Sequence, residues 1–118
     1  MAERYRLTVR EGPRVSRERF ASLPSALDAL AAHVAELTAR PERATIAAVA
    51  REFAPVAQVA ARAELRGPER WTPRIRAGID VRGDGSSEAW VGGSTRRVVE
   101  PADGETPLAA LRRVLMDA

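Results

Sequence analysis

The feature that most constrains the fold is an alternation of apolar and polar side chains in the second half of the chain. In AQVAARAELR, residues 57–66, every second position is apolar, and the positions between include Arg62, Glu64 and Arg66. Successive side chains of a β-strand point to opposite faces of a sheet, whereas a helix would scatter these charges around its axis. The segment is therefore expected to be a strand with one buried face and one polar face.

Two further segments show the same period. After the turn signals in RGPERWTP, apolar residues from position 75 to position 81 alternate with Arg74, Arg76, Asp80 and Arg82. At the N-terminus, YRLTVREGPRVSRERF alternates on both sides of a Gly-Pro dipeptide, which is typical of a β-hairpin. Both segments are predicted to be strands of an antiparallel sheet.

The stretch GIDVRGDGSSEAWVGG is best explained as the tip of a second hairpin, with a partner strand near residues 87–91. A three-residue loop over 84–86 would set Val81 opposite Ala89, whereas an even-numbered loop would set Val81 opposite Glu88. Since a slip of one residue moves every side chain to the wrong face, we predict the three-residue loop.

The same stretch does not fit a ligand-binding loop. A calcium loop beginning at Asp80 would need an oxygen ligand where Arg82 stands and a glutamate where Val91 stands. The glycines do not match a phosphate-binding loop, because the pattern G-x-x-x-x-G-K-[ST] is missing. We predict no metal site and no cofactor.

Two amphipathic helices are predicted from apolar residues spaced three and four positions apart. The first covers about residues 23–39, with Ser22 as its N-cap, and the second covers about residues 106–117, with Thr106 as its N-cap. The expected fold is one α+β domain over residues 1–118, with an antiparallel sheet of about five to seven short strands and both helices on one face. The count includes a strand near 95–100; for residues 45–53 a strand is favoured, but a helix stays open.

Composition excludes several classes of protein. The chain has 118 residues and no cysteine, so disulfides and thiolate chemistry are excluded. It has neither an apolar run of the roughly 20 residues that a membrane helix needs nor the apolar stretch of a signal peptide, so a cytoplasmic protein without membrane association is expected. All basic side chains are arginine and the formal net charge is only +3, which is mild for a dedicated DNA-binding protein.

Catalytic residues cannot be assembled from the sequence. His33, the single histidine, lies at the border of the first helix's apolar stripe, and Asp28 is too far around that helix to orient it. A nucleophile, a base and an orienting group cannot be placed together. We therefore expect a protein that is not an enzyme.

The best candidate site is a polar sheet face rich in arginine. Its candidate nucleic-acid-binding residues are Arg62, Arg66, Arg74, Arg76, Arg82, Trp71 and Trp90. Arginine with exposed tryptophan could follow phosphates and stack bases. The competing interpretation is that Glu64, Asp80 and Glu88 neutralise these arginines in cross-strand pairs.

The expected function is that of a small binding or accessory protein that recognises a protein partner or a second copy of itself. The first alternative is a nucleic-acid-binding module that uses the arginine face. The second alternative is a small-molecule carrier with an apolar pocket between helix and sheet, reached by polar groups such as His33.

Overall fold

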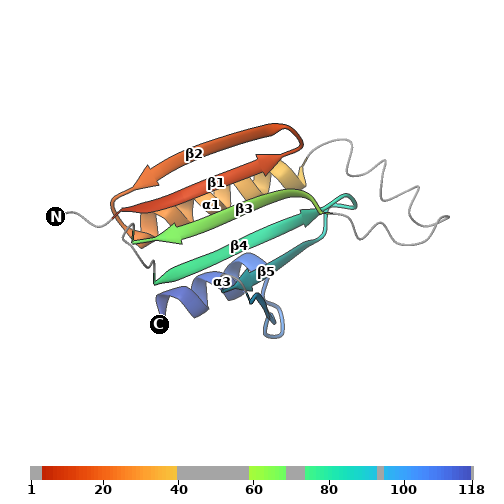
Figure 1. Cartoon of the computed structure of the whole chain (residues 1–118). Coiled ribbons are helices and arrows are strands. Elements are labelled where there is room, and N and C mark those ends of the chain that lie inside the picture. Colours follow the sequence, from red (N-terminus) through yellow and green to blue (C-terminus); the bar gives the residue numbers. More distant parts are fainter. Residues whose placement is uncertain (1–3, 40–58, 69–73, 93–94, 118) are drawn as a thin grey trace.

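The computed structural model describes residues 4–39, 59–68, 74–92 and 95–117, and these build an α+β fold (Figure 1). Six antiparallel strands form one sheet in the order β2-β1-β3-β4-β5-β6. The elements are β1 (Tyr5–Glu11), β2 (Arg14–Phe20), α1 (Leu23–Thr38), β3 (Val59–Gly67), β4 (Ile75–Arg82), β5 (Ser87–Val91), β6 (Arg97–Val99) and α3 (Pro107–Met116). The predicted architecture is confirmed. The predicted strand over residues 45–53 lies outside the described residues.

The strand predicted over residues 57–66 is confirmed from Val59 onward as β3, while residues 57–58 lie outside the described residues. Its alternation has the expected cause. Ala61, Ala63 and Leu65 are buried in the core beneath the helices, while the residues between them point to the other face. Val59 departs from the pattern, because the pairing with β4 shifts by one residue between Val59 and Ala61. This irregularity leaves Val59 44% exposed instead of buried.

The β4–β5 hairpin has a three-residue loop, as predicted, but the loop begins one residue earlier. Val81 lies opposite Ser87, not opposite Ala89, so the predicted pairs were wrong by two positions while every side chain keeps its predicted face. The third residue of such a loop takes a left-handed conformation. Here that residue is Gly85, with φ of 88°, whereas the predicted loop would have put Ser86 there. The glycine therefore decides the register.

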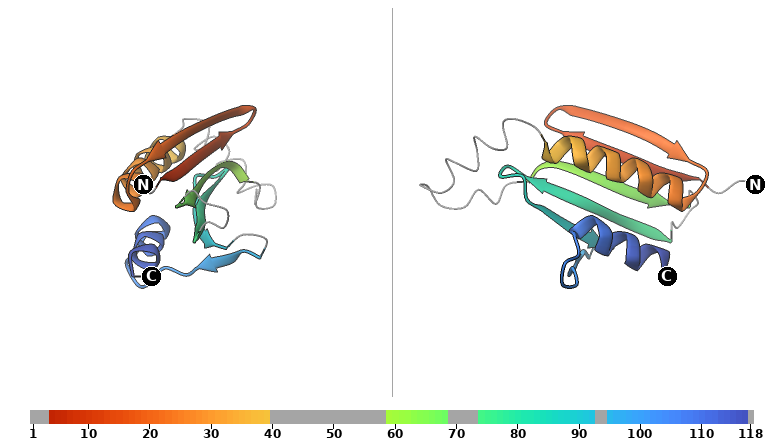
Figure 2. Two further views of the ribbon diagram at one scale, coloured as in Figure 1. Left: turned by 60° about the vertical axis from the view of Figure 1, so that its left-hand side comes forward. Right: turned by 180° about the vertical axis from the view of Figure 1, so that it is seen from behind.

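Both helices cover the same face of the sheet (Figure 2). α1 packs on β1, β2, β3 and β4, and α3 packs on β4, β5 and β6. The predicted caps are confirmed, since Ser22 Oγ accepts from the Ser25 N–H at 3.2 Å and Thr106 Oγ1 accepts from the Ala109 N–H at 3.1 Å. Neither described helix is long and apolar enough to cross a lipid bilayer.

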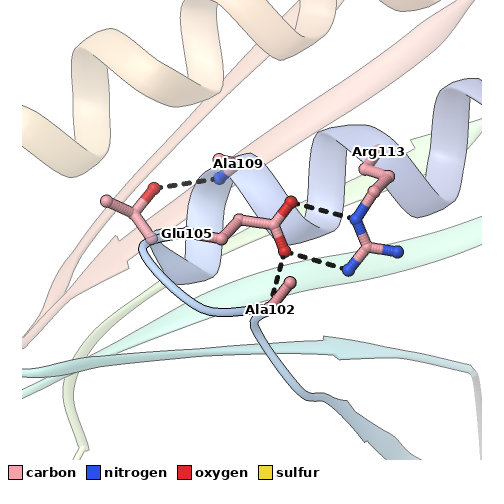
Figure 3. Close-up of polar contacts among 5 residues, drawn as sticks. Ala102, Glu105, Ala109 and Arg113 are labelled. Atoms are coloured by element: carbon pink, nitrogen blue, oxygen red, sulfur yellow. Dashed lines mark hydrogen bonds and ion pairs between the residues drawn. The ribbon is translucent and has the colours of Figure 1, made fainter.

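The start of α3 is held by one carboxylate as well as by its cap (Figure 3). Glu105 accepts hydrogen bonds from Arg113 Nε and Nη2, both at 2.9 Å, and from the Ala102 N–H at 2.9 Å. These bonds, the one from Arg113 first, lower the pKa of Glu105 to about 2. Glu105 thereby joins the loop before α3 to the last turns of the helix.

Candidate functional site

The polar face of the sheet is turned away from both helices, and no described element covers it (Figure 2). We call it the open face. Strand register assigns its side chains, since residues that pair directly lie on the same side. The polar and aromatic members, together with Gly78, are Arg6, Thr8, Arg10, Arg17, Arg19, Arg62, Glu64, Arg66, Arg76, Gly78, Asp80, Arg82, Glu88 and Trp90, and the register adds three exposed valines, Val15, Val59 and Val98.

Positive charge is concentrated on the open face. Its eight arginines and three carboxylates sum to a formal +5, whereas the whole chain carries +3. The rest of the molecule is therefore slightly acidic. A mildly basic composition conceals a strongly basic surface.

Four of these arginines stand in direct register across four neighbouring strands. Arg6 pairs with Arg19 on one side and with Arg66 on the other, and Arg66 pairs with Arg76. Neighbouring strands lie roughly 4.8 Å apart, so this arginine row is about 14 Å long between its outer Cα atoms. Like charges placed directly opposite one another destabilise a sheet. Arg66 and Arg76 form no ion pair with any residue that the structure describes.

The other end of the open face is neutralised. Arg62 donates through Nε and Nη2 to the two oxygens of Asp80, at 2.7 and 3.1 Å, and this bond raises the pKa of Arg62. Arg82 Nη2 lies 3.0 Å from Glu88 Oε2. Cross-strand neutralisation is thus confirmed for Arg62 and Arg82.

Trp90 lies on the open face, but the prediction that it is exposed was wrong, because only 3% of it is accessible. Its indole N–H donates to Asp80 Oδ1 at 3.0 Å. The ring packs closely against Gly78, where a Cβ atom would come 2.5 Å from the Trp90 Cζ2 atom. The guanidinium of Arg96 lies over the ring, 4.2 Å from its centroid. The guanidinium of Arg62 also lies over the ring, 6.0 Å from the centroid. These contacts surround a side chain whose position in the strand pattern predicted exposure.

Five of the seven predicted site residues meet on the open face: Arg62, Arg66, Arg76, Arg82 and Trp90. Arg74 lies just before β4 and is exposed, and Trp71 is outside the described residues. The site also contains arginines that sequence reasoning missed, namely Arg6, Arg10, Arg17 and Arg19 of the N-terminal hairpin. They occupy the polar positions of an alternation that was recognised, but the pairing of β1 with β3 joins segments about fifty residues apart and leaves no local signal.

His33 has a partner that the sequence did not indicate. Its Nε2 atom lies 2.6 Å from Glu18 Oε1 on β2, and both side chains are partly exposed. Beside this pair, Val9, Leu37 and Glu36 help to line a hollow of about 220 Å³ between α1 and the β1–β2 hairpin.

At the tip of the β4–β5 hairpin, the carboxylate of Asp84 is engaged in hydrogen bonds within the loop. Asp84 Oδ1 accepts from the Ser86 N–H at 2.9 Å and contacts Ser86 Oγ at 2.6 Å, and these bonds lower the pKa of Asp84. Within the described ranges, no group of three or more histidine and carboxylate side chains has the geometry to hold a metal ion.

Comparisons with known proteins assign this chain to no family. No protein-family model matches it, and no curated protein or solved structure matches it. Its function is inferred below from its own geometry and charge.

Proposed function

We propose that the protein is a non-enzymatic binding module whose open face binds the phosphate backbone of nucleic acid. The observation that carries this proposal is the arginine row, in which four arginines stand in direct register and two of them, Arg66 and Arg76, form no ion pair with a described residue. Such an arrangement destabilises the free protein and becomes favourable when an anionic chain lies along it. A guanidinium group can also donate two parallel hydrogen bonds to the oxygens of a phosphate in a bidentate geometry.

The distribution of the carboxylates favours an anion-binding site and argues against an ordinary surface of mixed charge. Asp80 and Glu88 neutralise arginines at one end of the open face, yet Arg66 and Arg76 at the other end form no ion pair within the described part of the chain. Biased codon usage can replace lysine by arginine, but it does not place like charges opposite one another on four successive strands.

The salt dependence of binding tests this proposal. The affinity of a fluorescent oligonucleotide is measured by anisotropy over a range of NaCl concentrations. Four phosphate contacts predict a slope of log affinity against log salt of about −3. In the double variant Arg66→Gln and Arg76→Gln, the slope should become shallower by about 1.5.

A matched variant separates the open face from net charge. Arg97 and Arg112 belong to the helix side of the molecule, because Arg97 pairs with Val91 and Arg112 binds Asp28 at 3.0 Å. The double variant Arg97→Gln and Arg112→Gln removes the same charge and should leave the slope unchanged. No binding at low salt, or equal losses in the two double variants, would contradict the proposal.

A second candidate function follows from the hollow beside His33. Its lining combines apolar residues such as Val9 and Leu37 with polar ones such as His33, as expected for the pocket of a small-molecule carrier. At about 220 Å³ it would admit only a small ligand. A thermal-shift screen of small metabolites tests this function, since a ligand that binds the folded state raises the melting temperature.

A further inference from the structure

Trp90 lies at one end of the arginine row. The backbone carbonyl oxygen of Arg76, the last residue of that row, accepts a hydrogen bond from the Gly92 N–H at 2.8 Å, and Trp90 stands two positions before Gly92 in the chain. Trp90 and Arg76 are therefore diagonal neighbours, roughly 7–8 Å apart. Trp90 is the one aromatic side chain on the open face among the described residues.

The indole of Trp90 is held by contacts with Gly78 and Asp80 and is covered by arginine side chains. Gly78 lies against one face of the ring, and Asp80 holds its N–H. Two guanidinium groups lie over the ring: that of Arg96 is 4.2 Å from the centroid, and that of Arg62, which is bound to Asp80, is 6.0 Å from it. Arg96 is itself exposed and forms no ion pair with any residue in the described ranges.

We infer that Arg96 is a movable cover over a base-stacking site, and that the ligand of the open face is single-stranded nucleic acid. In the bound state, phosphates lie along the arginine row, the guanidinium of Arg96 moves from the indole to a phosphate, and one base stacks on Trp90. This inference rests on the function proposed above.

The strengths of the competing contacts favour the movement of Arg96 from the indole to a phosphate and the stacking of a base in its place. The contact between Arg96 and the indole is a cation–π contact at the surface, which is weaker than the stacking of a base on an aromatic ring. An arginine that leaves the ring gains a charge-assisted bond to phosphate. Duplex nucleic acid cannot use this site, because its bases are already stacked on one another.

Fluorescence of Trp90 provides the test. In a Trp71→Phe background Trp90 is the sole tryptophan of the chain. An oligothymidine of about 12 nucleotides should quench its emission on binding, whereas a duplex of equal length should not. In the free protein, Arg96→Ala should make Trp90 more accessible to acrylamide, and it should make the salt slope for oligothymidine shallower by about 0.7.

The outcomes separate this inference from the proposed function. If both oligonucleotides bind with equal affinity and Trp90 emission does not change, the stacking site is disproved while the arginine face stands. If Arg96→Ala and the milder Arg96→Gln leave acrylamide quenching unchanged, Arg96 is not the cover. If neither oligonucleotide binds at low salt, the proposed function fails first. If the Trp71→Phe protein does not fold, the indole N–H resonance of Trp90 in the native protein gives the same readout.

Discussion

At the scale of single residues, Gly78 is the position on which the arrangement around Trp90 most depends. It lies in the middle of β4, where glycine weakens a strand unless another group approaches the backbone closely. Here the approaching group is the indole of Trp90, which lies where a side chain would otherwise stand. The alternation predicted the face of Trp90 correctly and its exposure wrongly. Gly78 was the sequence signal that could have indicated a ring packed closely against the strand.

Replacing this glycine should destabilise the protein. In Gly78→Ala the new Cβ would lie 2.5 Å from the Trp90 ring and 2.7 Å from the Ala63 carbonyl oxygen, and the second of these is backbone. Overpacking of this kind lowers the free energy of unfolding by about 1–3 kcal/mol. Urea unfolding followed by circular dichroism measures the loss. Thr8→Ala, on the same face of β1, serves as the control and should change stability by no more than about 1 kcal/mol. Equal stability of Gly78→Ala and the native chain would show that the ring does not lie on this strand.

At the scale of an element, the start of α3 depends on the ionised carboxylate of Glu105. Arg113 and the Ala102 N–H lower its pKa from 4.5 to about 2. Its stabilising effect is therefore complete above about pH 4.5 and is lost as the pH falls toward 2. In Glu105→Gln, the free energy of unfolding should be lower than in the native chain at pH 6, and the difference should disappear near pH 2.

The control for this experiment is Asp103→Asn in the same loop, because Asp103 forms no ion pair with a described residue. A difference between Glu105→Gln and the native chain that persists unchanged from pH 6 to pH 2 would mean that the carboxylate charge does not hold this helix.

The helices and strands themselves were largely predictable, because the spacing of apolar residues differs between a helix and a strand. The alternation identified β3, β4 and β5, and Ser22 and Thr106 marked the starts of both helices. What sequence reasoning could not supply was the neighbour of each strand. The pairing of β1 with β3, which brings Arg6 beside Arg66, depends on how the whole sheet assembles. For the same reason the bond between His33 and Glu18 could not be foreseen.

At the scale of the whole molecule, the sheet separates its surfaces by charge, and this separation has a thermodynamic consequence. Arg66 lies between Arg6 and Arg76, so Arg66→Thr removes two like-charge pairs and should raise the free energy of unfolding by a few tenths to about 1 kcal/mol at low salt. The gain should fade as salt screens the surface. Chemical denaturation at two salt concentrations measures it.

A neighbouring arginine gives the opposite sign and serves as the control. Arg62→Thr leaves the buried carboxylate of Asp80 without its bidentate partner, so it should lower stability by about 1–3 kcal/mol. If Arg66→Thr is destabilising at low salt as well, the arginine row does not destabilise the free protein, and its charges give no reason to expect an anionic ligand.

The claim that the open face is the binding surface is tested most directly by mapping an oligonucleotide titration on the backbone amide resonances. We expect the largest shifts on β1, β3 and β4 around Arg6, Arg66 and Arg76, and hardly any change at the amides of α1 and α3. Shifts confined to the two helices, with the amides of the arginine row unchanged at saturating oligonucleotide, would contradict this claim.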